Sequence, residues 1–279
     1  MASGTINAGQ RALWNGASGR KWVETQRVLD EMFAPFERLL IESLSGREGG
    51  ALLDVGCGTG ATTLAAARAG VSGWHCTGLD ISAPMLALAR ERATQAGLDV
   101  TFLEADAQDC TFAPQSTDLI ISRFGVMFFA DPVAAFANLH RAARRDGQLR
   151  VIAWRSAADN PFMTAAERAV APLLPQAPVR DPSGPGQFAF ADASNVRSIL
   201  ERGGWSDVDI RPIDVECSIA LADLDLYATR LGPIGLILPT LDPTLRVEVA
   251  EAARAAFAPF IQGEQVRLTA ACWQIDARA

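Results

Sequence analysis

A glycine-rich turn is the part of this 279-residue sequence whose residue types and spacing could do chemistry. Residues 52–60 read LLDVGCGTG, and Gly56, Gly58 and Gly60 lack the Cβ atoms that would keep a ligand away from the backbone. In a parallel sheet, the turn from the first strand into its helix lies at the edge where nucleotide-like ligands bind. Short glycine motifs are shared by many kinds of binder, so the turn alone predicts only a generic ligand loop.

Three aspartates near the ends of successive predicted strands narrow the choice of ligand. Asp54 stands two residues before the first glycine of the turn, Asp80 ends the second strand, and Asp106 follows the third. Asp80 is placed to accept from both hydroxyls of a ribose, Asp106 to accept from an adenine amino group, and Asp54 suits a cationic amino-acid end. Three carboxylates make a poor site for a pyrophosphate. They favour a ligand that carries a sulfonium.

The elements that must position these residues alternate between short apolar strands and helices. Strands are predicted at 51–55, 74–80, 100–105, 118–124, 148–154, 207–215 and 266–275. Helices between the first five are predicted at 61–69, from the N-cap Ser82 to Gly97, and at 132–143 after the N-cap Asp131. Strict alternation implies a parallel sheet with right-handed crossovers and helices on both faces.

Three stretches fall outside this alternation. Residues 1–48 carry apolar residues at helical spacing and predict an N-terminal helical cap, in which Pro35 is expected to mark a break or the first turn of a new helix. The remainder, 49–279, is predicted as one domain with insertions at about 156–203 and 222–262. The first insertion contains a Pro- and Gly-rich loop at 172–186, which we interpret as a lid or substrate loop, and a helix at 192–202.

Four runs of sequence carry a family resemblance: LLDVGCGTG, GLDIS at 78–82, EADAQ at 104–108 and DLIISRFGVMFFADP at 118–132. Together they resemble the class I S-adenosylmethionine (SAM)-dependent methyltransferases, in particular a bacterial small-molecule branch similar to ubiquinone/menaquinone-type methyltransferases. The resemblance implies an α/β, Rossmann-like fold. Its seven-stranded sheet would be mostly parallel with an antiparallel last strand, and would carry a helical cap and lid insertions. The implied cofactor is SAM, with S-adenosyl-L-homocysteine (SAH) as its product.

The resemblance also implies which residues contact the cofactor. The glycine turn would border the methionine end, and the residues after Asp80 and Asp106 would hold the base. Two N-terminal tryptophans would close over the site. The implied cofactor-binding set is Trp14, Trp22, Asp54, Gly56, Cys57, Gly58, Gly60, Asp80, Ile81, Met85, Asp106, Ala107, Ser122 and Phe124.

Arg123 is the candidate catalytic residue, because a charged side chain at the end of an apolar strand needs a carboxylate or a ligand as its partner. The other chemically versatile side chains are scarce. Lys21 is the only lysine, and it stands in a polar N-terminal stretch, which excludes a P-loop and a Schiff-base lysine. His75 starts a strand and His140 ends a helix, so both are predicted to lie far from the site edge.

Composition excludes further classes of function. The formal net charge of −7 gives no basic field for nucleic acid. No apolar run is long enough to span a membrane and the N-terminus lacks a secretory h-region, so we expect a cytoplasmic protein. Five cysteines without C-x-x-C spacing predict reduced thiols and no metal site. Oligomeric state is not indicated.

The sequence therefore predicts direct in-line transfer of a methyl group from SAM to an O, N or C atom of a small molecule. Proximity and orientation can lower such a barrier by about 7–11 kcal/mol. Two alternatives remain. A nicotinamide-dependent reductase would need the wider G-x-G-x-x-G spacing, yet residue 61 is Ala, and Tyr227, the only tyrosine, has no lysine partner. A non-catalytic SAM-binding protein would bind SAM without turnover.

Overall fold

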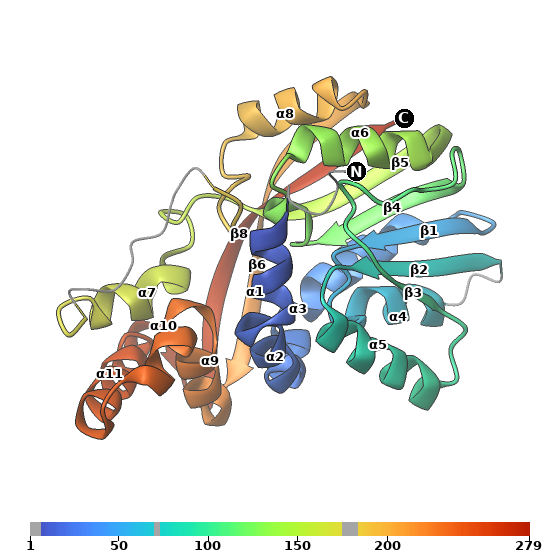
Figure 1. The fold of residues 1–279 in the computed structure, drawn as a ribbon. Coiled ribbons are helices and arrows are strands. Elements are labelled where there is room, and N and C mark those ends of the chain that lie inside the picture. Colours follow the sequence, from blue (N-terminus) through green and yellow to red (C-terminus); the bar gives the residue numbers. More distant parts are fainter. Residues whose placement is uncertain (1–6, 70–72, 175–183) are drawn as a thin grey trace.

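The computed structural model describes residues 7–69, 73–174 and 184–279. Their strands form one sheet in the order β3-β2-β1-β4-β5-β8-β6, with a short β7 paired to β8 (Figure 1). The strands are β1 (Gly50–Val55), β2 (Trp74–Asp80), β3 (Thr101–Glu104), β4 (Thr117–Arg123), β5 (Ala143–Trp154), β6 (Ser206–Ala220), β7 (Ile261–Gln262) and β8 (Gln265–Arg278). Strands β1 to β5 pair in parallel, and β8 runs antiparallel to both β5 and β6. The predicted Rossmann-like α/β fold is confirmed.

Helices cover both faces of this sheet, as the alternation requires (Figure 1). The α-helices are α1 (Ala8–Asn15), α2 (Ala17–Glu24), α3 (Gln26–Ile41), α4 (Ala61–Arg68), α5 (Ala83–Ala96), α6 (Pro132–Ala142), α7 (Pro161–Val170), α8 (Ala193–Arg202), α9 (Leu224–Arg230), α10 (Gly232–Ile237) and α11 (Pro243–Ala255). Helices α3, α4 and α5 pack on one face, and α6 and α8 on the other. Helices α1 and α2 stand across the edge where the parallel strands end.

One local expectation was wrong, and another is confirmed in position but not in its hydrogen bond. Helix α3 continues through Pro35, because it buries Met32, Phe36 and Leu40 along one face, and that packing outweighs the loss of one backbone hydrogen bond. Ser82 is the N-cap residue of α5, as predicted, but its side chain does not cap the helix, because its hydroxyl instead donates to the carbonyl oxygen of Trp14 at 2.7 Å.

The C-terminal strands are longer than their apolar patterns indicated. Strands β6 and β8 remain paired from Ser206–Arg278 to Ala220–Gln265, whereas β5 ends beside Cys272. The two strands therefore extend past the parallel sheet as a twisted ribbon. Helices α9 to α11 and helix α7 pack together beside this extension, and α10 also contacts α2 (Figure 1). Helix α7 lies in the first insertion, where only the loop and α8 were predicted. The predicted loop at 172–186 lies largely outside the described residues.

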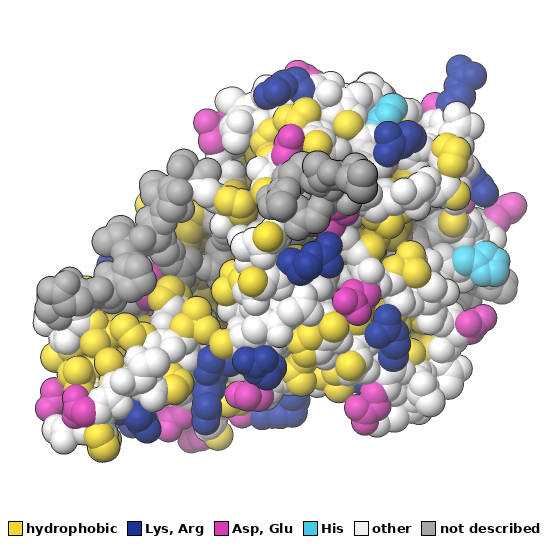
Figure 2. Space-filling view, viewed as in Figure 1, with side chains coloured by type: hydrophobic (Ala, Val, Ile, Leu, Met, Phe, Trp, Pro, Cys, Tyr) yellow, Lys and Arg dark blue, Asp and Glu magenta, His cyan; other side chains and the backbone are white. Residues whose placement is uncertain are grey.

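One large core follows the sheet and includes the buried face of α3 and the aromatic side chains of Phe136, Phe190 and Phe257. On the visible face of the molecule, charged side chains of both signs are interspersed among apolar ones, so this face has no extended basic tract (Figure 2). Among the described helices, none combines the length and apolar composition needed to cross a membrane. The division of the chain at residue 48 stays a prediction.

Candidate functional site

A cavity opens where β1, β2, β3 and β4 end, beneath α1 and α2. Its walls combine the glycine turn, three buried carboxylates and a set of aromatic rings. The residues that line it are Asn7, Trp14, Trp22, Phe33, Asp54, Val55, Gly56, Cys57, Gly58, Thr59, Thr62, Leu79, Asp80, Ile81, Met85, Ala105, Asp106, Ala107, Arg123, Phe124, Gly125, Phe128 and Phe129. Every residue predicted for the site lies in this lining except Gly60 and Ser122.

The glycines of the turn have different tasks. A Cβ at Gly56 would lie 2.6 Å from the Cα of Gly125, so Gly56 allows the end of β1 to pack against the end of β4. A Cβ at Gly58 would instead project between Met85 and Trp22, at 3.8 and 3.9 Å, where both line the cavity. Gly58 also has a φ of 55°, a conformation that favours glycine. Gly58 is therefore the glycine that keeps the cavity open.

Asp80 ends β2 and holds the glycine turn. Its Oδ2 accepts from the backbone amide of Gly58 at 2.8 Å, and its Oδ1 accepts from the amide of Ser82 at 2.9 Å. Burial raises the pKa of Asp80 to about 6, although these backbone hydrogen bonds lower it. Each oxygen keeps a further lone pair, so the carboxylate can still accept from a ligand.

Asp54 is buried beneath the turn. Its Oδ2 accepts from the Thr63 hydroxyl at 2.6 Å, and its Oδ1 has no hydrogen-bond partner among the described residues. Burial raises its pKa to about 6, while the Thr63 hydroxyl and the charge of Arg123 lower it. An unpartnered carboxylate oxygen at a cavity wall is suited to a cationic or hydrogen-bond-donating ligand.

Asp106 follows β3 and is linked to the N-terminal segment. Its Oδ2 accepts from Nδ2 of Asn7 at 2.7 Å, and its Oδ1 accepts from the amide of Gln108 at 3.0 Å. The Oδ1 of Asn7 is buried without a partner among the described residues. Asn7 and Asp106 both line the cavity, at the end opposite Asp54 along the strand order β3-β2-β1.

The cap is bound to the loops that carry these carboxylates. Asn15 donates to the carbonyl of Ile81 at 2.8 Å and accepts from the amide of Ala83 at 2.9 Å. The ring of Trp14 packs edge-on against Trp22 and Phe128, with centroids 6.0 and 5.1 Å apart. These contacts explain why helices α1 and α2 lie over the cavity rather than elsewhere on the surface.

Arg123 ends β4 and has an incomplete set of partners. Its guanidinium lies 5.7 Å from the ring centroid of Phe33, and its Nη2 is 4.0 Å from Oδ1 of Asp30. The other oxygen of Asp30 is held by Arg92 at 2.6 Å. The Nη1 of Arg123 also donates to the carbonyl of Phe33 at 3.5 Å. Arg123 is therefore a largely buried cation at the cavity wall that shares its nearest carboxylate, Asp30, with Arg92.

Phe124 follows Arg123 in a left-handed conformation, with a φ of 62°. Its ring stacks on Trp154 at a centroid distance of 4.3 Å, and Phe33 and Phe36 pack edge-on against it. The strained backbone is held by this aromatic packing. Trp154 supports the wall from behind, but does not line the cavity.

Gly60 and Ser122 lie behind the cavity wall. A Cβ at Gly60 would lie 3.0 Å from Ala89 on α5 and 3.1 Å from the ring of Phe102 on β3. This glycine therefore allows the start of α4 to pack closely against α5 and β3. The Ser122 hydroxyl donates to the carbonyl of Val55 at 2.7 Å and accepts from the amide of Gly125 at 3.1 Å. It joins the ends of β1 and β4. His75 and His140 are also absent from the lining described here.

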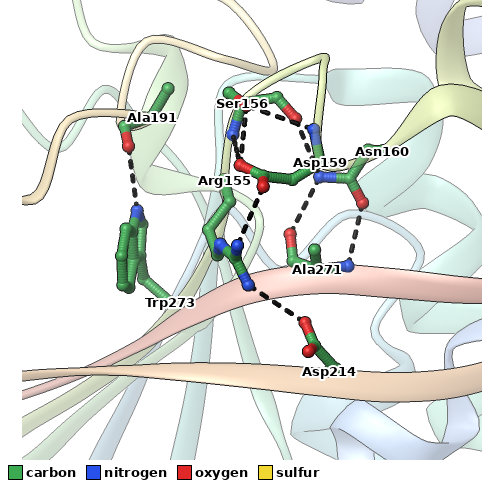
Figure 3. A network of polar contacts seen from close by, with 8 residues as sticks. All are labelled: Arg155, Ser156, Asp159, Asn160, Ala191, Asp214, Ala271 and Trp273. Carbon is green, nitrogen blue, oxygen red and sulfur yellow. Dashed lines mark hydrogen bonds and ion pairs between the residues drawn. The ribbon is translucent and has the colours of Figure 1, made fainter.

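Arg155 leaves β5 near the same edge but belongs to a separate polar network (Figure 3). Its guanidinium pairs with Asp159 at 2.8 Å and with Asp214 on β6 at 3.0 Å, and lies 5.4 Å from the ring centroid of Trp273. The neighbouring Asn160 exchanges two hydrogen bonds of 2.9 Å with the backbone of Ala271. This network fastens the start of the first insertion to β8.

Sequence reasoning did not identify several residues of the lining. Asn7 precedes any motif, and Phe33 was assigned only to a helix core. Phe128 and Phe129 belong to the run at 118–132, but an aromatic residue in an apolar run is equally typical of a hydrophobic core. A cluster of three or more His, Cys, Asp or Glu side chains placed to hold a metal ion does not occur among the described residues.

Residues 53–151 match the family model of a methyltransferase domain. The chain is 28% identical over 187 residues to a demethylmenaquinone methyltransferase of Renibacterium salmoninarum, which covers 64% of this chain and 76% of that protein. It is 33% identical over 152 residues to an aklanonic acid methyltransferase of a Streptomyces species, covering 53% of this chain and 66% of that protein.

The chain spans about half the length of the uncharacterised mycobacterial relatives that it also matches, at 52% and 53% of those proteins. Among solved structures, a phosphoethanolamine N-methyltransferase of Haemonchus contortus in complex with S-adenosyl-L-methionine superimposes with a TM-score of 0.59. Its sequence identity is 16%, and the match covers 96% of this chain and 59% of that one. The structural likeness shows a shared fold.

Proposed function

We propose that this chain, whose residues 53–151 match a methyltransferase domain, is a SAM-dependent methyltransferase acting on a small organic molecule. The observation that carries the proposal is the set of three buried carboxylates, Asp54, Asp80 and Asp106, around one cavity beside a glycine turn. Against them the lining offers one cation, Arg123. This balance of charge suits a cationic ligand and disfavours a pyrophosphate.

The residues present fit SAM in shape and in hydrogen-bonding capacity. Two buried acceptor atoms, Asp54 Oδ1 and Asn7 Oδ1, have no partner among the described residues, and SAM carries an ammonium at one end and an amino group at the other. Gly58 leaves the space between Met85 and Trp22 free. We assign the ribose hydroxyls to Asp80 and the amino-acid end to Asp54 and the glycine turn.

SAM supplies a methyl group that its sulfonium already activates. The protein's task is then to align the acceptor and to exclude water. Trp14 and Trp22 close the cavity from the cap, where Trp14 packs against Phe128. Phe33 and Phe124 form an aromatic wall beside Arg123. Arg123 would hold an anionic or electron-rich group of the acceptor, since its nearest carboxylate, Asp30, lies 4.0 Å away and pairs more closely with Arg92.

No histidine lines the cavity among the described residues. This favours an acceptor that is already nucleophilic, such as an amine, or an acidic hydroxyl or carbon, and leaves a carboxylate of the lid as the alternative base. A direct in-line transfer needs no covalent enzyme intermediate and no metal ion. The acceptor atom can be O, N or C, because alignment alone does not select among them.

Calorimetric titration of SAM and SAH into the wild type and Asp80→Ala tests the cofactor assignment. The wild type should bind both ligands, and Asp80→Ala should bind each at least tenfold more weakly, a loss of about 1.4 kcal/mol. Equal binding by the two proteins would contradict the ribose assignment. Formation of SAH from SAM is then measured with amines, phenols and acidic carbon compounds. Tight SAM binding without turnover would support a non-catalytic SAM-binding protein instead.

A further inference from the structure

Arg92 on α5 makes two charge-assisted contacts beneath the glycine turn. Its Nη1 donates to the carbonyl oxygen of Thr59 at 2.6 Å, and its Nη2 donates to Oδ2 of Asp30 on α3 at 2.6 Å. The side chains of Arg92 and Asp30 are only 21% and 20% exposed, so water screens their charges less than on an open surface. The planar guanidinium has several donors in a fixed arrangement, which lets Arg92 hold both partners at once.

Thr59 occupies the part of the turn where the backbone is least restricted by side chains. It stands between two glycines with left-handed conformations, Gly58 with a φ of 55° and Gly60 with a φ of 84°. The amide of Gly58 donates to Asp80 at 2.8 Å, and the amide of Gly60 donates to the carbonyl of Cys57 at 2.9 Å. The Thr59 carbonyl lies between these two bonds, and its donor on α5 fixes the direction in which it points.

Asp30 orients Arg92 from the cap helix α3. Its Oδ2 accepts from Arg92 and from Gln26, and its Oδ1 is the carboxylate oxygen 4.0 Å from Nη2 of Arg123. One carboxylate is therefore the ion-pair partner of two arginines, one bonded to the glycine turn and one in the cavity lining. Neither Asp30 nor Arg92 belongs to the sequence runs that carry the family resemblance.

We infer that Arg92 is a positioning residue for the methyl donor: it acts on the glycine turn through Thr59, and Asp30 acts through Arg92. The inference rests on the proposed function, which assigns the amino-acid end of SAM to this turn. Thr59 is buried in the cavity lining, whereas Arg92 and Asp30 are not among the described residues of that lining. A binding group that is misplaced by about 1 Å loses much of its effect, so support from behind the wall matters for affinity.

Calorimetric titration with SAH tests the inference on the folded, full-length protein. Arg92→Met should bind SAH about tenfold more weakly than the wild type, and Asp30→Asn about threefold more weakly. The double variant should bind SAH within about twofold of Arg92→Met, because Asp30 has no route to the turn once Arg92 is lost. If Arg92→Met does not fold by circular dichroism, Arg92→Gln replaces it in both comparisons.

Arg90→Met is the matched control. Arg90 lies on the same helix and also donates to a backbone carbonyl, that of Phe102 on β3, at 3.0 Å. Its loss should leave the affinity for SAH within about twofold of the wild type. Arg92→Lys tests rescue: it keeps a cationic donor for the Thr59 carbonyl and should bind SAH only about threefold more weakly than the wild type.

Hydrogen exchange followed by mass spectrometry gives a local readout that a general loss of stability would not produce. In the ligand-free protein, Arg92→Met should increase deuterium uptake in a peptide that contains the glycine turn and leave a β3 peptide unchanged. Arg90→Met should leave uptake in the turn unchanged.

The outcomes separate this inference from the proposed function. If the wild type does not bind SAH, the proposed function fails and the positioning role fails with it. If the wild type binds SAH and Arg92→Met binds it equally well, only the role of Arg92 is overturned. Additive losses in the double variant would overturn the claim that Asp30 acts through Arg92. Unchanged uptake in the turn of Arg92→Met, or equal losses of affinity in Arg90→Met and Arg92→Met, would overturn the inference.

Discussion

The backbone amide of Gly58 donates a 2.8 Å hydrogen bond to Oδ2 of Asp80, which joins the turn after β1 to the residue that ends β2. Because of this bond, Gly58 and the carboxylate of Asp80 lie next to each other in the cavity lining. Two motifs 22 residues apart in sequence therefore act as one unit. A change in the charge of Asp80 or in the space beside Gly58 should affect ligand binding without unfolding the sheet.

The first prediction concerns pH. Burial raises the pKa values of Asp54 and Asp80 to about 6, above the value near 3.9 expected for an unfolded aspartate. Between about pH 4 and pH 6 the folded state holds protons that the unfolded state has lost, so these groups lower the free energy of unfolding of the ligand-free protein as pH rises. Thermal melts across this range measure that slope.

Affinity for SAM should change in the opposite direction. The ionised carboxylates attract a cationic ligand, so SAM should bind about tenfold more tightly at pH 7.5 than at pH 5. Asp54→Asn should reduce this pH dependence because it removes one of the two titrating groups. SAM affinity that stays constant from pH 5 to pH 7.5 in the wild type would contradict the prediction.

The second prediction separates backbone strain from cavity filling. Gly58→Ala should cost about 1 kcal/mol of stability and should weaken SAH binding at least tenfold, because the methyl group enters the cavity. Gly97→Ala is the control: Gly97 has a φ of 63° and no atom within 4 Å of an added Cβ. It should lose similar stability and keep its affinity. Urea denaturation and calorimetry give the two readouts.

The third prediction concerns the serine between β1 and β4. Ser122→Ala leaves the Gly125 amide and the Val55 carbonyl without their partner, so it should destabilise the fold by about 1–3 kcal/mol. Ser116→Ala, which removes a hydroxyl bonded to Ala113 in an exposed turn, should stay within about 0.5 kcal/mol of the wild type. Equal urea midpoints of unfolding for the two variants would refute the role of Ser122 in joining β1 to β4.

The fourth prediction tests Arg123 as the residue that contacts the acceptor. Arg123→Met should lower turnover at least tenfold, about 1.4 kcal/mol, and should leave the dissociation constant of SAH within about twofold. Arg155→Met, which disrupts the network outside the cavity, should leave turnover unchanged. If SAH binding falls as much as turnover in Arg123→Met, the arginine contacts the donor instead.

Much of the fold was predictable because the parallel strands are short, apolar and separated by helices. The strand at 74–80 was predicted at its observed bounds. Gly97 ends α5 and Asp131 caps the start of α6, as predicted. The family resemblance is confirmed by the domain match over 53–151. Helix α7 was not predicted, because residues 156–171 were assigned only to an insertion, without an element of their own.

Sequence by itself determined that the glycine turn, Asp54, Asp80 and Asp106 would meet, because parallel strands bring their carboxyl ends to one edge. Only the tertiary structure decided which atoms remain free there. Asn7 lies 99 residues from Asp106 in the chain, and the hydrophobic periodicity of the sequence does not predict their contact. The tertiary structure also places Ser122 behind the cavity wall and Arg123 in the cavity lining. The local sequence pattern predicts the strand to which a side chain belongs, whereas its contacts depend on segments that are distant in the sequence.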